Sequence, residues 1–580
     1  MKFSTFHFIV WMMLCLPAIG FTQTLTRSLG KQGIVRETGT NIPIEGATIS
    51  LLPSKQALMS DEQGAFFIKS FENIDSIKVS VIGFETIAIS FHDFVNAGCS
   101  IALSRQTAEL SSVTISMNAG DQFRPISKTD IQLRGINNSQ EVLPIVPGLF
   151  IGQHAGGGKA EQIFLRGFDI DHGTDINIGV DGMPVNMVSH AHGQGYADLH
   201  FVIPELIENV QFKKGPYYAE KGNLATTGFV DFRTKNMLDK NMVRLEAGQF
   251  NAWRAVGMVN LLSEKMRQKN QSAYIGSEYM YTNGYFENPQ HFNRINLFGK
   301  YYGKLNANNT LNISASVFNS KWKASGQIPE RAVSEGLISY FGAIDPNEGG
   351  NTGRTNLNAR LQTTLANGNV IKNQLYFTKY DFELYSNFTF FYVDSINGDE
   401  IKQKEKRNLA GYNGSYTDVR YAGNTKITSE IGVSARYDQT NNSELSRTKR
   451  RTTLIEPLKL GDIKELNTAL FLNETFRLSE RFSINAGLRR DYFNMSYKDK
   501  LDNDLISKKN TGLLSPKLNF YFYPNDKTEI YFTTGKGFHS NDTRVAVQSA
   551  GRQALPAAYG SDLGAVLKPS RNLLLNVAAW

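Results

Sequence analysis

Strict alternation of apolar and polar residues marks the second half of the chain. From Leu311 to Val317, apolar residues alternate with Asn and Ser, and a similar alternation runs from Leu518 to Phe522. A period of two residues is typical of β-strands that have one apolar and one polar face. The pattern predicts long antiparallel strands from about residue 236 to residue 580. A water-soluble sandwich and a membrane barrel would both satisfy it.

The spacing of the connections favours the barrel. Longer loops are expected within residues 323–353, 439–465 and 540–570. Short turns on one side and long loops on the other are typical of outer-membrane barrels, whose long loops face outward. Six short turns are expected near Lys269, Asn308, Asn367, Asn424, Glu480 and Asn525.

The first hundred residues have a different pattern. Lys2, an apolar stretch from Phe8 to Leu16 and a small-residue zone after it predict a secretory signal peptide over residues 1–22, so the mature chain is exported. From residue 33 to residue 103, short β-like runs alternate with turn residues. That rhythm predicts a small β-sandwich, which we assign to residues 23–105.

Composition excludes several classes of protein. After the signal there is no run of about 18 apolar residues, so membrane-spanning helices are not expected. Cys99 is the one cysteine beyond the signal, which excludes an internal disulfide and a Cys-rich zinc site. The net charge of +8 arises from 62 basic and 54 acidic residues that are intermixed along the chain, so no nucleic-acid partner is expected.

Residues 121–235 carry several motifs in a fixed order. They include Arg166-Gly167, Asp181-Gly182, Lys214-Gly215-Pro216 and the apolar run 228–232. In this order they resemble the plug domain of TonB-dependent receptors. The resemblance implies an α+β plug domain over residues 121–235, held inside a transmembrane barrel. The family usually has Arg-Gly-Pro where this chain has Lys214; Lys keeps the charge but lacks the bidentate guanidinium fork.

The segment before the plug also resembles this family. The sandwich is similar to the carboxypeptidase-regulatory-like domain of Bacteroidetes-type receptors, and because the sequence contains no His-x-x-Glu zinc pair, we treat it as a non-catalytic spacer. Within a linker over residues 106–120, an extended β-branched heptapeptide suits strand addition to a periplasmic partner. It resembles a TonB box; the alternative is one more sandwich strand. The heptapeptide consists of Leu110, Ser111, Ser112, Val113, Thr114, Ile115 and Ser116.

The resemblance also sets an expectation for the barrel. Barrels of this family have 22 strands, whereas residues 236–580 give room for about fourteen. We therefore expect an incomplete transmembrane antiparallel β-barrel, truncated at its C-terminus; a genuinely small barrel is the alternative. The predicted fold as a whole is mainly β: signal peptide, small β-sandwich, α+β plug domain and incomplete barrel.

Histidines are concentrated in the plug. Five of the nine histidines lie within 47 residues, two of them in a Gly-rich His-Ala-His segment. Neutral imidazole binds zinc, copper, nickel or iron, so the cluster suggests a site for a metal or metal chelate on the outer side of the plug. Hydrogen bonds within a polar plug interior are the alternative. The candidate ligands are His154, His172, His190, His192 and His200.

No enzymatic motif accompanies these features. The chain has neither a Gly-x-Ser-x-Gly elbow nor a phosphate-binding loop. We therefore predict a non-enzymatic receptor in the Gram-negative outer membrane, without a resident cofactor, that imports a scarce extracellular ligand using energy relayed by TonB. Its expected partners are the TonB complex, outer-membrane lipids and a small ligand, with a metal or siderophore-like chelate first. Alternatives are an importer of oligosaccharide or another organic nutrient, and a ligand-sensing or adhesive barrel.

Overall fold

A computed structural model gives the fold of the chain. The predicted signal peptide, the heptapeptide 110–116 and His154 lie outside the described residues. The structure describes residues 31–580 except 39–42, 45, 54–55, 62, 69–73, 82–83, 85–86, 105–135, 137–138, 154–156, 526, 549–552 and 571–572. The chain separates into two compact units, residues 1–109 and 110–580.

The first unit contains the predicted β-sandwich. Two sheets, ordered β4-β1-β7 and β3-β2-β5-β6, enclose one apolar core that includes Val35, Ile49, Ile77 and Phe94. The helix α1 (Phe91–Asn96) begins at Ser90, whose side chain accepts a hydrogen bond from the Asp93 amide, as expected of an N-cap residue. The strands are β1 (Lys31–Glu37), β2 (Thr48–Pro53), β3 (Gln56–Met59), β4 (Ala65–Ile68), β5 (Ile74–Ser80), β6 (Ile87–Ser90) and β7 (Ser100–Leu103).

The plug forms the first part of the second unit. Its strands build one sheet ordered β10-β9-β8 and another ordered β12-β11-β14-β13, with a shared apolar core. The helical elements of its described part are the 3-10 helices η1 (Ser139–Ile145) and η2 (Pro204–Leu206). The strands are β8 (Leu149–Gly152), β9 (Gln162–Leu165), β10 (Phe168–Asp169), β11 (Ile176–Val180), β12 (Met183–Pro184), β13 (Ile207–Lys214) and β14 (Gly228–Thr234).

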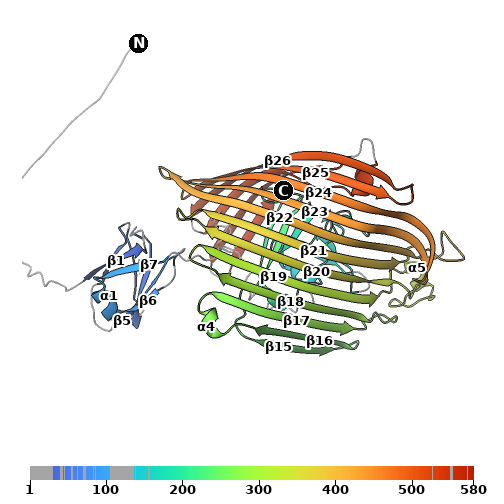
Figure 1. The fold of residues 1–580 in the computed structure, drawn as a ribbon, viewed down its shortest axis with the longest axis horizontal. Helices are drawn as coiled ribbons and strands as arrows, with labels where there is room; N and C mark the ends of the chain where they lie inside the picture. Colours follow the sequence, from blue (N-terminus) through green and yellow to red (C-terminus); the bar gives the residue numbers. More distant parts are fainter. Residues whose placement is uncertain are drawn as a thin grey trace, which may run out of the picture. The chain divides into compact units, whose positions relative to one another are not determined.

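A single antiparallel sheet of fifteen strands follows, one more than the sequence predicts, each strand paired with the next (Figure 1). Among the described residues the sheet is open, with β15 and β29 at its edges. The strands are β15 (Met242–Gly248), β16 (Ala252–Asn260), β17 (Gln271–Thr282), β18 (Phe292–Lys304), β19 (Asn309–Lys323), β20 (Gly349–Thr364), β21 (Val370–Ser386), β22 (Ile401–Ala422), β23 (Thr425–Lys449), β24 (Thr453–Ser479), β25 (Phe482–Asp499), β26 (Leu505–Asn525), β27 (Thr528–Phe538), β28 (Ala557–Ser570) and β29 (Leu573–Ala579).

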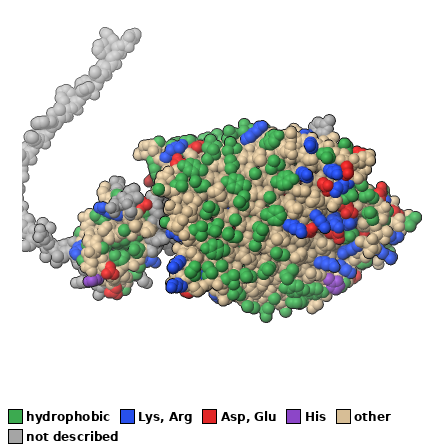
Figure 2. All heavy atoms as spheres, in the orientation of Figure 1, with side chains coloured by type: hydrophobic (Ala, Val, Ile, Leu, Met, Phe, Trp, Pro, Cys, Tyr) green, Lys and Arg blue, Asp and Glu red, His purple; other side chains and the backbone are tan. Residues whose placement is uncertain are grey.

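In this sheet the polar side chains are buried and the apolar side chains are exposed, which is the reverse of a soluble protein. On β19, Asn312 and Ser314 are buried, whereas Val317 is 43% exposed. On β26, Asn519 is buried and Phe522 is exposed. Figure 2 shows apolar side chains spread over the outward surface of the sheet. Apolar-out, polar-in alternation is the pattern of a transmembrane barrel, and it resolves the choice that the alternation alone left open. No helix among the described residues is long and apolar enough to cross a membrane.

The connections also follow the predicted asymmetry. Successive connections of an antiparallel meander lie at opposite ends of the sheet, and each of the six predicted short turns falls between two paired strands. The helix α4 (Glu264–Arg267) lies at this short-turn end, and α5 (Glu330–Ser334) lies at the opposite, long-loop end (Figure 1). At the long-loop end the connections are residues 249–251, 283–291, 324–348, 387–400, 450–452, 500–504 and 539–556.

Two of the predicted long loops are wrong in extent. Most of residues 439–465 belongs to β23 and β24, which pair almost to the tip of the hairpin with register shifts between Thr440 and Ser443 and near Arg447. The bulges break the simple alternation, so the sequence pattern resembles a loop. Residues 557–570 form β28, so the predicted loop 540–570 is shorter; it contains α6 (Thr543–Ala546).

Candidate ligand-binding site at the plug apex

The sheet surrounds the plug on nearly all sides. Side chains from β16 to β28 donate or accept hydrogen bonds with plug groups, which places the plug on the polar face of the sheet. Representative pairs are Arg254–Glu205, Asn296–His200, Lys300–Asp181, Arg354–Pro184, Gln374–Asp181, Arg436–Asn186, Arg489–Glu220, Asn519–Tyr217 and Arg166–Asp562. In Figure 1 the strands of the plug lie behind those of the sheet.

Two of the sequence motifs form tight turns. Arg166 and Gly167 have φ values of 53° and 78°, and Asp181 and Gly182 have values of 49° and 78°. Two successive residues with positive φ are characteristic of the type I′ turn that joins two antiparallel strands. The first turn connects β9 to β10 and the second connects β11 to β12. These motif residues therefore fix the chain reversals of the plug.

The same turns bind the plug to the sheet. The Arg166 guanidinium donates two hydrogen bonds to Asp562 of β28, at 3.0 and 2.5 Å, and also stacks over the Trp580 ring. Asp181 accepts from the amide and hydroxyl of Thr234, and its carboxylate lies 3.5 Å from the Lys300 ammonium of β18. Arg166 and Asp181 thus each lie in a tight turn of the plug and make a charged contact with the sheet.

The third motif contacts the sheet through its backbone. Gly215 has a φ of 77°, and a Cβ there would collide with the Tyr217 ring, so glycine is required. The carbonyl oxygen of Pro216 accepts a hydrogen bond of 2.6 Å from the Lys517 ammonium of β26. The Lys214 ammonium lies beside Gly148 of the plug. One contact of this motif with the sheet therefore runs through the carbonyl of Pro216.

The plug apex is the part of the plug nearest the long loops, residues 157–160, 169–172 and 184–195. Barrel side chains hold its segment 184–191 by the backbone. Guanidinium groups donate to the carbonyl oxygens of four residues in this segment, while Glu405 accepts from the Ala191 amide. The four guanidinium contacts are Arg354 to Pro184, Arg436 to Asn186, Arg407 to Ser189 and Arg544 to His190, at 2.9, 2.9, 3.3 and 2.8 Å.

Sequence reasoning missed these barrel residues. A signal was present, because Gln403, Glu405 and Arg407 follow one another at every second position of β22 and so share its inward face. The partners of that face are set by tertiary structure, about 200 residues away from the plug segment that they hold.

Four of the five candidate histidines lie in the described part of the plug, and they occupy three environments. His190 is fully buried: its ring stacks on Tyr196 with centroids 4.3 Å apart, and its Nε2 lies 3.2 Å from the Tyr380 hydroxyl. His200 is also buried, and its Nδ1 lies 2.8 Å from both Asp198 and Gln140. These two histidines match the alternative prediction, in which the histidines form hydrogen bonds in the polar interior of the plug.

His172 and His192 form a pair. Their Nε2 atoms are 3.1 Å apart. The Nδ1 of His192 lies 2.8 Å from Oε1 of Gln403, and the Nδ1 of His172 lies 3.3 Å from the carbonyl oxygen of Glu161. Asp171 stands beside the pair, its Oδ1 3.5 Å from Nε2 of His172 and its side chain 56% exposed. The pair is thus closed on the plug side and open beside Asp171.

Burial controls the charge of this region. Burial, with the nearby Lys159 ammonium, lowers the pKa of His172 to about 4 and holds the pKa of His192 well below its usual value. Burial also lowers the pKa of Lys159 to about 8. Both imidazoles are therefore neutral at pH 7, the form that binds metals.

The histidines do not gather into one centre. Among the described residues, no group of three or more His, Cys, Asp or Glu side chains is arranged to hold a metal ion. The pair His172–His192 offers two nitrogen donors to one ion.

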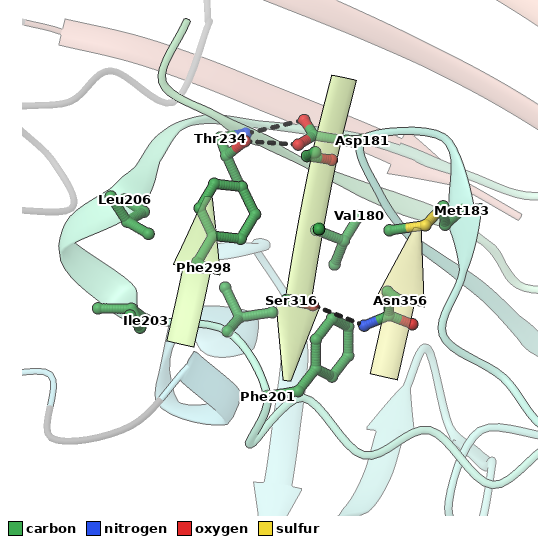
Figure 3. Close-up of a pocket in the computed structure, with 13 residues that line it drawn as sticks. Val180, Asp181, Met183, Phe201, Ile203, Leu206, Thr234, Phe298, Ser316 and Asn356 are labelled. Atoms are coloured by element: carbon green, nitrogen blue, oxygen red, sulfur yellow. Dashed lines mark hydrogen bonds between the residues drawn. The ribbon is translucent and has the colours of Figure 1, made fainter. Parts of the chain in front are cut away.

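A separate narrow cavity lies between the plug and the sheet (Figure 3). Apolar plug side chains, among them Val180, Ile203 and Leu206, face Phe298 of β18 across it, and Ser316 and Asn356 close one side with a hydrogen bond. It is distinct from the histidine pair. The plug therefore leaves a small gap against β18–β20.

Comparison with known proteins agrees with this architecture. The sequence matches the TonB-dependent receptor plug domain over residues 111–229 and the TonB-dependent receptor-like β-barrel over residues 281–579. The fold is similar to that of the unliganded ferric citrate transporter FecA, with a TM-score of 0.67 and 15% identity over 77% of this chain and 67% of that one.

Two further solved structures share the fold. The ferric-catecholate import receptor Fiu of E. coli K12 has a TM-score of 0.61 and 15% identity, over 78% of this chain and 72% of its own. The copper transporter OprC has a TM-score of 0.58 and 15% identity, over 75% and 68%. The barrel match spans more than half of the chain, and the plug, the apolar-out sheet and the loop asymmetry accord with it, so this protein belongs to the TonB-dependent receptor family.

Proposed function

We propose that this protein is a non-enzymatic outer-membrane importer that captures a metal ion or metal chelate at the plug apex and delivers it to the periplasm. One observation carries the choice of ligand: two neutral imidazoles lie side by side at the part of the plug nearest the long loops. The similar structures include a ferric citrate transporter, a ferric-catecholate import receptor and a copper transporter, which supports the same class of cargo here.

Energy for import would reach the plug through residues 110–116. Leu110 to Ser116 lie at the start of the plug match and would add as a strand to TonB, where affinity comes from main-chain hydrogen bonds. Force applied there would displace plug elements from the charged contacts that hold them to the sheet. An apolar cavity already separates part of the plug from β18–β20.

The experiment compares wild type with Val113→Pro in whole cells. Proline removes a main-chain donor, so strand addition to TonB should fail while surface binding persists. Cells limited for zinc, copper, nickel or iron are supplied with one metal or ferric chelate, and accumulated metal is measured. We expect accumulation with wild type and with the control Ser111→Ala, and none with Val113→Pro. Equal accumulation in all three strains, or none in any, would overturn the proposal.

An organic nutrient is the second candidate. Aromatic rings from two long loops form an exposed cluster, in which Tyr285 contacts Phe341 edge to face and Phe341 contacts Tyr340. Exposed ring faces can stack on a sugar or another flat ligand. Uptake of a labelled oligosaccharide, absent for every metal, would favour this function over metal import.

A further inference from the structure

We propose, building on the metal-import function above, that His172 and His192 together bind one divalent first-row metal ion that keeps open or exchangeable coordination positions, in contrast to a chelate that saturates its metal. The cargo would then be copper, zinc or nickel, arriving as the hydrated ion or with a loosely bound small ligand.

The hydrogen bonds around the pair suit metal binding. Gln403 donates through its amide nitrogen to the Ala191 carbonyl, so the oxygen of that side chain faces Nδ1 of His192. The Glu161 carbonyl oxygen lies beside Nδ1 of His172. Both oxygens are acceptors, and a ring that carries its hydrogen on Nδ1 can bind a metal through Nε2. The two Nε2 atoms lie 3.1 Å apart, close enough to ligate one ion.

The geometry suits a metal ion. With metal–nitrogen distances of about 2.0–2.1 Å, nitrogens 3.1 Å apart subtend an angle of about 100° at the ion, between square-planar and tetrahedral values. Metal-ligating histidines almost always donate their other ring N–H to a carbonyl, carboxylate or water, as both histidines do here. Imidazole donors favour zinc, copper and nickel over magnesium, calcium and manganese.

The groups around the pair favour reversible binding of the ion. The pair supplies two donors, and the exposed Asp171 carboxylate is the nearest acidic group to it. Lys159 lies near enough for its charge to act on both rings, which weakens the binding of a cation. A site with two fixed donors and an opposing charge can release its ion, as transport requires. A metal already enclosed by six donors could not accept either imidazole.

The histidines also differ in what holds them. His192 is held by Gln403 of β22, whereas His172 is held by the plug backbone at Glu161. An ion bound between them would therefore join the barrel-held segment 184–192 to the β9–β10 part of the plug. Binding of the ion would therefore affect both of these parts of the plug.

The test uses the purified full-length chain in detergent, titrated calorimetrically with CuCl₂, ZnCl₂ and NiCl₂. We expect saturable binding of one ion, and with copper an electron paramagnetic resonance signal split by two nitrogens. His172→Gln and His192→Gln should each abolish the two-nitrogen signal, while the exposed-loop control His291→Gln should leave it unchanged. Copper held by EDTA, whose six donors fill the ion, should not bind.

Two milder variants separate a metal site from a structural pair. Gln403→Leu removes the acceptor for His192 and should weaken binding by about tenfold, whereas Gln403→Glu keeps an acceptor and should not. Lys159→Met removes the opposing charge and should tighten binding, which disruption of the fold would not do. Absence of binding by folded wild type, or copper–EDTA binding that ignores both histidines, overturns the proposal. Because these readouts need neither cells nor TonB, failure of import with intact binding would overturn the proposed function alone.

Discussion

Asp181 links three parts of the molecule through one carboxylate. It turns the chain between β11 and β12, accepts two hydrogen bonds from Thr234 of β14, and lies against Lys300 of the sheet. Burial raises the pKa of Asp181, but the Lys300 ammonium and the Thr234 hydrogen bonds outweigh burial, so the pKa lies below the usual 3.8. The ionised form is therefore the one that the fold stabilises.

We expect Asp181→Asn to loosen the plug. The substitution removes the carboxylate charge beside the buried Lys300 ammonium, and breaking a buried ion pair in this way costs roughly 3–5 kcal/mol. Hydrogen–deuterium exchange of residues 176–180 and 228–234 should rise strongly relative to wild type. Asp169→Asn, in the same domain but exposed, is the matched control and should exchange as wild type does. Equal exchange in both variants would mean that the Asp181 contacts do not hold the plug sheet.

The stability of the plug in the wild-type protein should depend on pH through the same carboxylate. Because the folded pKa lies below the unfolded value, the stabilisation is fully present above about pH 4 and is lost as pH falls through the folded pKa. Exchange of residues 176–180, corrected for its intrinsic pH dependence, should therefore increase below pH 4 in wild type. In Asp181→Asn that increase should be smaller, and an identical acid profile in the two proteins would contradict the assignment.

Individual residues differ in how far the sequence predicts them. Arg166-Gly167 and Asp181-Gly182 stand out because a type I′ turn needs residues that tolerate positive φ, a local requirement. His190 could not be judged in this way, since its partner Tyr380 lies 190 residues further along the chain. The pairing of His172 with His192 likewise depends on the fold of the whole plug.

At the level of elements, the apex segment 184–191 is anchored to the barrel at several points along its backbone. Four barrel arginines donate to its carbonyl oxygens, and the amide of Thr543 donates to the Ser189 hydroxyl at 2.9 Å. Import by plug displacement requires some of these contacts to break. A covalent bond at this place should therefore stop import without removing the binding site.

A disulfide between Ser189→Cys and Thr543→Cys provides that bond. The Thr543 amide and the Ser189 hydroxyl are 2.9 Å apart, so the two residues are in contact, and a disulfide requires Cα atoms about 4.4–6.8 Å apart. In a Cys99→Ser background, the oxidised protein should bind metal normally but accumulate none in cells, and dithiothreitol should restore uptake. Each single cysteine variant is a control. Undiminished uptake by a fully oxidised protein would show that segment 184–191 stays in place during transport.

The barrel elements were predictable where their pattern was regular. All six short turns follow from alternation interrupted by Asn, Lys or Glu, because turn chemistry is local. The sequence predicts a loop over residues 439–465 of the β23–β24 hairpin because bulges near Thr440 and Arg447 disturb the period of two. The expectation that the chain has fewer strands than a complete family barrel stays a prediction.

For the whole molecule, the decisive property is the reversal of polarity across the sheet. Inward side chains such as Asn356 and Arg407 are buried against the plug, and outward ones such as Leu297 and Val317 are exposed. In water such a surface would be unfavourable, whereas in a bilayer it matches the hydrocarbon region. The plug provides the inner polar face with partners, so sheet and plug each require the other.

This polarity predicts where a new charge is tolerated. Val317→Arg places a guanidinium on the outward face beside Leu297, its partner on β18, and should cost roughly 2–4 kcal/mol in a bilayer. Leu337→Arg introduces the same side chain at a 76% exposed position of the long loop 324–348, where water is available, and should cost little. The folded fraction after refolding into phosphatidylcholine vesicles, read from heat-modifiable electrophoretic mobility, measures the difference. If both variants fold in vesicles as wild type does, the outward face near Val317 does not contact lipid. The sheet would then not span the bilayer at this position.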